Sequence, residues 1–145
     1  AVHPRSPSRE ADRDWLADKL RLADFAVTQS VFDVETYVGM VGELRQRGVT
    51  SPVLPGIMPI LSAGSIERQS TLGAVVPLPL RARIEAAGDD SRRVRAVGIE
   101  AATELCRDLL AAGAPGLHFY TLNRSPATRE IYANLGLRPG NQAAS

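Results

Sequence analysis

The sequence has little of what most metal and disulfide sites require. Its 145 residues contain one cysteine and two histidines. A single cysteine excludes a disulfide framework and a cysteine metal cluster, and so few histidines predict no metal site. No run of 18 apolar residues occurs, so we expect no membrane-spanning helix. This cysteine usage is typical of a reducing cytoplasm, which is the location that we expect.

The sequence also has no large excess of positive or negative charge. The 17 basic and 16 acidic residues give a formal net charge of +1. This balance predicts no attraction to nucleic acid or to an anionic membrane surface. Neither a nucleophile elbow nor a glycine-rich phosphate loop is present, which argues against a serine hydrolase and a nucleotide-binding loop.

What the sequence does contain is a repeated alternation of apolar runs and helical patterns. Continuous apolar runs predict strands at 1–3, 24–30, 52–60 and 116–122. The helical spacing of apolar residues predicts the intervening elements. These helices are expected at about 8–22, 33–48, 65–72, after Pro79, 89–112 and 126–135.

Strands alternating with helices indicate an α/β fold with parallel strands. Two architectures fit: an open doubly wound sheet, or part of a (β/α)8 TIM barrel. A complete barrel requires about 250 residues, and the four βα units counted here amount to half of one. We expect residues 1–140 to form this half-barrel and residues 141–145 to be a loose tail.

Polar side chains follow the predicted strands where each one ends. His3, Gln29 and Arg124 stand at three of these ends. Because the carboxyl ends of parallel strands share one edge, this edge is the expected ligand site. Each residue also has a structural alternative. Gln29 could bond a loop backbone, Arg124 could pair with Asp33 or Glu130, and His3 could be solvated or cap a helix.

Two further side chains are assigned to the core. Trp15 lies on the apolar stripe predicted for the first helix, with Leu16 and Leu20. Cys106 shares the inward stripe of the longest helix, so packing is its expected role. We expect both to be buried and neither to act in a site.

Three motifs taken together resemble the methylenetetrahydrofolate reductase family. They read "FAVTQSVFDVETY" (25–37), "PVLPGIMPI" (52–60) and "HFYTLNR" (118–124), in this order and spacing. The similarity runs from His3-Pro4 to "GLRPG" at 136–140 and corresponds to the second half of the family's catalytic barrel. The resemblance therefore implies a (β/α)8 barrel, of which this chain supplies the last four βα units.

The resemblance also implies an activity and a folate substrate. The family reduces 5,10-methylenetetrahydrofolate to 5-methyltetrahydrofolate in one-carbon and methionine metabolism. NADH or NADPH supplies a hydride, which bound FAD passes on. Gln29 matches the family's pterin-binding glutamine, and Arg124 matches the arginine of "TLNR" on the folate side. Asn123 is expected to support Arg124 or the loop, and Phe119 and Tyr120 are assigned to packing.

The same resemblance places part of a flavin site on the first unit. His3 matches a residue near the adenosine portion, and Asp12 and Lys19 match positions that bind the ribityl and phosphate parts. The sequence departs from the family pattern at Trp15, Asp18 and Leu61–Gly64. These departures weaken the expected FAD contacts more than the folate contacts, so a reductase that takes hydride directly from NADH stays open.

The family's acidic proton donor has no counterpart in this sequence, so no catalytic residue is assigned. We expect the 145 residues alone to be inactive as a reductase. The alternative function is a non-catalytic folate-binding half-barrel or a module that pairs with another chain. The oligomeric state stays open, with a homo-oligomer among the possibilities, as does the choice between NADH and NADPH.

Overall fold

A computed structural model describes residues 6–137 of the chain, as three strands and six helices. His3, the predicted strand at 1–3 and the predicted tail at 141–145 lie outside these residues. The elements, in chain order, are α1 (Arg9–Leu20), β1 (Ala26–Ser30), α2 (Val34–Gln46), β2 (Val53–Ile57), α3 (Ala63–Thr71), α4 (Leu78–Ala86), α5 (Ser91–Ala111), β3 (His118–Phe119) and α6 (Pro126–Asn134).

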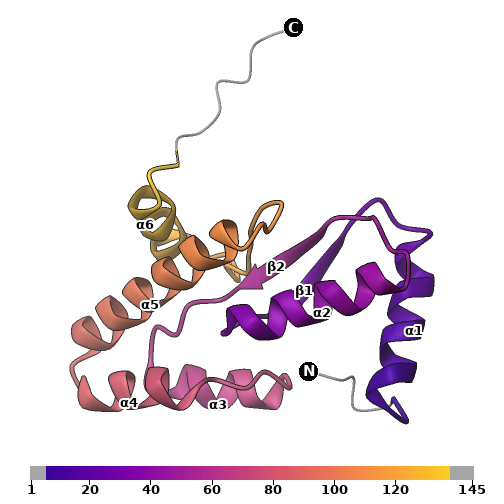
Figure 1. The fold of residues 1–145 in the computed structure, drawn as a ribbon. Coiled ribbons are helices and arrows are strands. Elements are labelled where there is room, and N and C mark those ends of the chain that lie inside the picture. Colours follow the sequence, from indigo (N-terminus) through magenta and orange to yellow (C-terminus); the bar gives the residue numbers. More distant parts are fainter. Residues whose placement is uncertain (1–5, 138–145) are drawn as a thin grey trace, which may run out of the picture.

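The three strands form one parallel sheet in the order β1-β2-β3. Figure 1 shows β1 and β2 side by side, with α2 lying along them. The main core gathers buried side chains of α1, α2, α5 and α6 with Val53 and Ile57 of β2. The predicted α/β fold with parallel strands is confirmed, and the arrangement is consistent with part of a barrel wall.

Several helices begin at a side-chain cap or end before a glycine. The side chain of Ser8 accepts a hydrogen bond from the backbone of Ala11 at the start of α1. Asp33 caps α2 in the same way, and Gly48 and Gly113 follow α2 and α5 with positive φ. Ser125 occupies the corresponding position before α6, but its side chain makes no capping bond.

The predicted burial is confirmed for Cys106 and is wrong for Trp15. Cys106 is fully buried, and this burial raises the pKa of its thiol to about 12. Trp15 is 52% exposed. The inward stripe of α1 instead runs through Arg13, Ala17 and Leu20.

Arg13 can be buried because carboxylates neutralise it. Its Nε donates to Glu43 of α2 at 2.6 Å, and its Nη1 donates to Asp12 at 2.7 Å. Arg9 also pairs with Glu43. Ion pairs thus join α1 to α2, and the inward face of α1 carries a buried arginine that the predicted apolar stripe did not include. Within residues 6–137, no helix has both the length and the apolar character needed to cross a bilayer.

Candidate functional site

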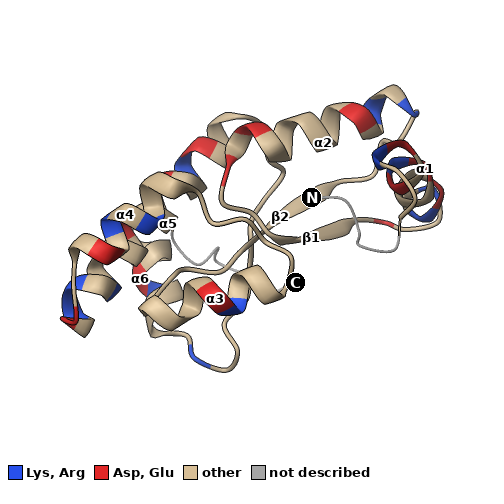
Figure 2. Cartoon of the chain, turned by 90° about the horizontal axis from the view of Figure 1, so that it is seen from below, with Lys and Arg blue, Asp and Glu red and all other residues tan. Residues whose placement is uncertain are grey.

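The carboxyl ends of the three strands define the candidate site. Gln29 lies near the end of β1, and Arg124 follows β3 by five positions in the chain. Because the strands are parallel, β1 and β3 point their carboxyl ends the same way, and both residues lie at or after these ends. Figure 2 shows that the charged residues lie mainly on the helices, while β1 and β2 carry none. Gln29 is the exposed residue of β1, so this strand presents an uncharged amide to solvent.

Gln29 sits in a β-bulge. Val27 pairs with Leu54 and Ser30 pairs with Gly56, so three steps along β1 match two steps along β2. One extra residue is therefore accommodated at Thr28-Gln29. Bulges are rare between parallel strands, and they often re-aim a side chain beside a functional site.

Side chains complete the hydrogen bonding of this bulge. The hydroxyl of Thr28 accepts from the backbone N–H of Gly56 at 2.9 Å and donates to the carbonyl of Gln29 at 2.6 Å. The hydroxyl of Tyr120 donates to the carbonyl of Thr28 at 2.8 Å. Backbone pairing then resumes, with Val31 N–H donating to Gly56 at 2.9 Å. The bulge is thus held by the neighbouring strand β2 and by Tyr120, the residue that follows β3.

The Tyr120 ring reaches β1 by crossing over Gly56. A β-carbon at Gly56 would stand 2.5 Å from the carbonyl oxygen of Thr28 and 2.6 Å from Cε2 of Tyr120. His118 meets the Tyr120 ring edge to face, with centroids 4.8 Å apart. Tyr120 packs on the sheet, as predicted, and it also bonds the strand that carries Gln29. Sequence reasoning missed this second role and the part of Thr28. The glycine inside a strand was the available signal, because it often marks a bulge or a close approach.

Gln29 and Arg124 are both exposed, and within residues 6–137 neither side chain has a hydrogen bond or ion pair. The alternative partners proposed for Arg124 are engaged elsewhere. Glu130 pairs with Arg95 at 2.9 Å, and Asp33 caps α2. Hydrogen bonds from the side chain and backbone of Thr36 lower the pKa of Asp33. The structural alternatives for Gln29 and Arg124 are therefore not found in the described chain.

Arg124 is reached through a tight turn. Leu122 and Asn123 both have positive φ, at 48° and 61°, and the N–H of Arg124 donates to the carbonyl of Thr121 at 2.8 Å. Asparagine tolerates the left-handed conformation better than most residues, whereas leucine adopts it with strain. Asn123 thus contributes through its backbone, because its side chain makes no bond in the described part of the chain. Strained turns of this kind often lie at ligand sites.

The residues assigned to FAD do not build a complete flavin site. Asp12 accepts hydrogen bonds from Ser6 Oγ at 2.9 Å and from Arg13, so its carboxylate is engaged within the protein. Lys19 is exposed, with no hydrogen bond or ion pair among residues 6–137, and it could meet a phosphate. His3 lies outside the described residues. Within residues 6–137, no group of three His, Cys, Asp or Glu side chains is placed to hold a metal ion.

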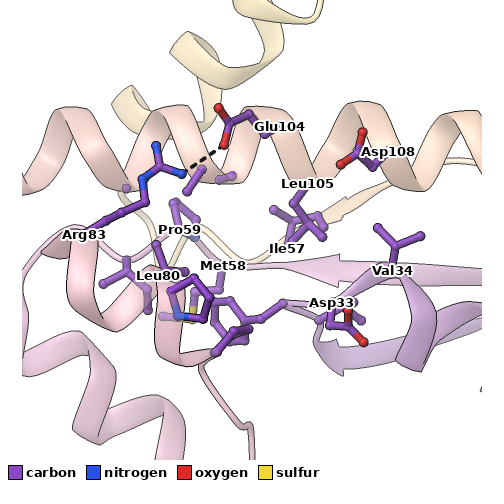
Figure 3. Close-up of a pocket in the computed structure, with 18 of the residues that line it drawn as sticks. Asp33, Val34, Ile57, Met58, Pro59, Leu80, Arg83, Glu104, Leu105 and Asp108 are labelled. Atoms are coloured by element: carbon purple, nitrogen blue, oxygen red, sulfur yellow. Dashed lines mark hydrogen bonds and ion pairs between the residues drawn. The ribbon is translucent and has the colours of Figure 1, made fainter.

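A pocket of residues 6–137 lies away from these side chains. It has a volume of about 440 Å³ and lies between the start of α2, the end of β2, α4 and α5. Figure 3 shows Ile57 and Leu105 within it and Arg83 bonded to Glu104 at its side. Neither Gln29 nor Arg124 lines it. The candidate site is instead an open edge of the sheet.

Comparison with known proteins shows what the whole chain is similar to. The chain is 40% identical over 138 residues to a probable methylenetetrahydrofolate reductase (NADPH) of Caenorhabditis elegans, covering 93% of this chain and 21% of that protein. It is 37% identical over 132 residues to methylenetetrahydrofolate reductase (NADH) 1 of Arabidopsis thaliana, covering 90% and 22%. It is 31% identical over 141 residues to 5,10-methylenetetrahydrofolate reductase of Escherichia coli, covering 96% and 48%.

The chain thus spans about a fifth of the first two relatives and about half of the bacterial one. Among solved structures, it is similar to an uncharacterized protein from Clostridium thermocellum that binds two copies of 5-methyl-5,6,7,8-tetrahydrofolic acid. The TM-score is 0.57 at 16% identity, over 88% of this chain and 48% of that one, which supports the fold. The sequence profile of methylenetetrahydrofolate reductase matches residues 1–136. The chain therefore belongs to the methylenetetrahydrofolate reductase family.

Proposed function

We propose that this chain forms the second half of a cytoplasmic (β/α)8 barrel that reduces 5,10-methylenetetrahydrofolate to 5-methyltetrahydrofolate with NADH or NADPH. The observation that carries the proposal is a pair of exposed side chains, Gln29 near the end of β1 and Arg124 after β3, that make no hydrogen bond or ion pair within residues 6–137. Membership of the family and the nicotinamide nucleotides named for its relatives support it.

The two side chains suit the two ends of a folate. A pterin ring presents hydrogen-bond donors and acceptors along one edge, and the amide of Gln29 offers both in one plane. The guanidinium of Arg124 keeps its charge and can form paired bonds to a carboxylate of the glutamate tail. Gln29 therefore orients the ring, and Arg124 anchors the substrate.

The hydride originates from the nicotinamide in this proposal. FAD, when bound, relays a hydride in the family, but Asp12 is engaged by Arg13 and Ser6, so we derive no step through flavin. We propose that flavin binds weakly here or that hydride passes directly from NADH. A visible spectrum of the purified full-length protein tests this: a stoichiometric yellow flavin band would contradict it.

Titration with 5-methyltetrahydrofolate tests the folate site in the full-length protein. We expect Gln29→Ala and Arg124→Ala each to weaken binding by about tenfold, the effect of one lost bond to a charged or well-oriented group. Gln46→Ala and Arg92→Ala remove the same chemistry from exposed positions on α2 and α5, and they should leave the affinity unchanged. Equal affinities for all four variants would refute the assignment.

Turnover separates the two candidate functions. Oxidation of NADH or NADPH that depends on 5,10-methylenetetrahydrofolate identifies the reductase. Folate binding without turnover in the full-length protein would instead identify a non-catalytic folate-binding protein.

A further inference from the structure

We propose that Tyr120 is a positioning residue that holds the bulge of β1, and with it Gln29, in the geometry that binds folate. The inference rests on the proposed function and deepens it. It is carried by the bond from the Tyr120 hydroxyl to the Thr28 carbonyl, which joins residues 92 positions apart in the chain.

The first step is that the bulge leaves Gln29 outside the regular ladder. The extra residue at Thr28-Gln29 removes these positions from the paired register that begins at Ala26 and resumes at Ser30. A side chain at such a position is aimed by local bonds, because the ladder no longer sets its direction. Something other than the sheet must therefore define the orientation of Gln29.

The second step is that Tyr120 bonds the peptide group that enters Gln29. The carbonyl of Thr28 belongs to the peptide unit that ends at the nitrogen of Gln29. This unit is planar, so a bond to its oxygen restricts the backbone on both sides. The Thr28 hydroxyl adds a bond to the carbonyl of Gln29 at 2.6 Å. The backbone is thus held just before and just after the Gln29 α-carbon.

The third step is that the ring of Tyr120 is itself fixed. It lies over Gly56, where a β-carbon would come within 2.6 Å of it, and its edge meets the ring of His118. Its own N–H donates to the carbonyl of Ile57 at 2.9 Å. Because the ring is held in place, its hydroxyl can fix the position of the Thr28 carbonyl on the far side of β2. Tyr120 also precedes Arg124 by four residues.

Tyr120→Phe in the full-length protein tests the proposal. The ring stays over Gly56, and only the bond to Thr28 is lost. We expect the Kd for 5-methyltetrahydrofolate to rise by about tenfold, the scale of one hydrogen bond in a site. In a Gln29→Ala background the same change should have less than about a twofold effect, because residues that act through each other are not additive.

Tyr37→Phe is the matched control. The hydroxyl of Tyr37 donates to the carbonyl of Val53 at 2.7 Å from the helix-covered face of the sheet. Its loss should lower the unfolding temperature and leave the Kd within about twofold. This control separates a role in binding from a general loss of stability.

Three results would overturn the proposal. The first is a Tyr120→Phe protein with the wild-type Kd, provided that Gln29→Ala weakens binding. The second is full additivity of Tyr120→Phe and Gln29→Ala, which would mean that Tyr120 contacts the ligand independently. The third is no folate binding by the wild-type protein, which would refute the proposed function itself and is thereby distinguishable from the other two.

Discussion

Gly56 is a residue whose missing side chain has structural consequences. The carbonyl of Thr28 and the Tyr120 ring both occupy the space that a β-carbon would need. The position lies inside β2, where glycine is otherwise unfavourable because it orders a flexible backbone and packs no side chain. Its presence therefore reflects the crowding of β1, β2 and Tyr120 at the candidate site.

Gly56→Ala should destabilise the full-length protein by about 2–3 kcal/mol, the range for overpacking against groups that cannot move freely. Folate affinity should fall as well, since Thr28 and Tyr120 must shift. Denaturant unfolding and titration with 5-methyltetrahydrofolate measure the two effects.

Gly42→Ala on α2 is the control, because no atom lies within 4 Å of a β-carbon there. Gly42→Ala should raise the free energy of unfolding by about 0.5–1 kcal/mol, because alanine has a higher helix propensity than glycine. A Gly56→Ala protein as stable as the wild type would contradict the crowding described here.

At the scale of elements, α1 is attached to α2 by charge as well as by packing. Arg9 and Arg13 of α1 both bond to Glu43 of α2. Burial raises the pKa of Glu43, but the hydrogen bonds from Arg9 and Arg13 outweigh it and lower the pKa below its ordinary value of 4.5. A carboxylate whose pKa is lowered in the folded state stabilises that state above its unfolded pKa.

Glu43→Gln should therefore lower the free energy of unfolding by about 1–2 kcal/mol at pH 7, the value of hydrogen bonds to a charged group. The difference from wild type should shrink as the pH falls below 4.5 through the lowered pKa of Glu43, because the wild-type side chain is then protonated too. Unfolding curves between pH 3 and 7 measure this.

Glu67→Gln on the exposed surface of α3 is the control and should show no such trend. A Glu43→Gln deficit that stays constant down to pH 3 would show that the ion pairs do not attach α1.

The elements were largely predictable from the sequence, and their details were not. The pattern predicted a helix at 89–112, and α5 spans Ser91–Ala111, because apolar spacing and Gly113 define it locally. The strand predicted at 116–122 is only His118–Phe119, since the chain soon enters the turn at Leu122 and Asn123. Pairing and turn geometry decide a strand's length, and neither is encoded in apolar spacing.

The candidate site shows the same division. Gln29 and Arg124 were predicted as strand-end residues; Gln29 is exposed near the end of β1, and Arg124 is exposed in the loop five residues after β3. The bulge and the bond from Tyr120 were not predictable, because both depend on register between strands distant in sequence. Trp15 was misassigned because a buried arginine is rare, and only the carboxylates of Asp12 and Glu43 make it favourable.

At the scale of the whole molecule, residues 6–137 leave apolar surface uncovered. Trp15 is 52% exposed and Phe25 is 56% exposed, and in the sheet of these residues β1 and β3 have no neighbour on their outer edges. Unpaired edges and apolar patches promote association in water. A complete barrel would cover both, which agrees with the chain spanning about half of its bacterial relative.

The 145 residues produced alone should therefore self-associate and show no folate-dependent oxidation of NADH. Light scattering after size-exclusion chromatography measures the association, and absorbance at the nicotinamide band measures the activity. The full-length protein is the control. A monodisperse monomer of 15.5 kDa with reductase activity would refute the half-barrel.

The bulge also decides where the chain goes after β1. Side chains of a regular strand alternate between two sides, so Ala26 and Val31, five positions apart, would point in opposite directions. Both nevertheless pack into the same core beneath the helices. The inserted residue reverses this alternation, so Val31 faces the core just before Asp33 starts α2. A chain one residue shorter at this point should turn Val31 away from that core, so the inserted residue that re-aims Gln29 also seats the connection to the next helix.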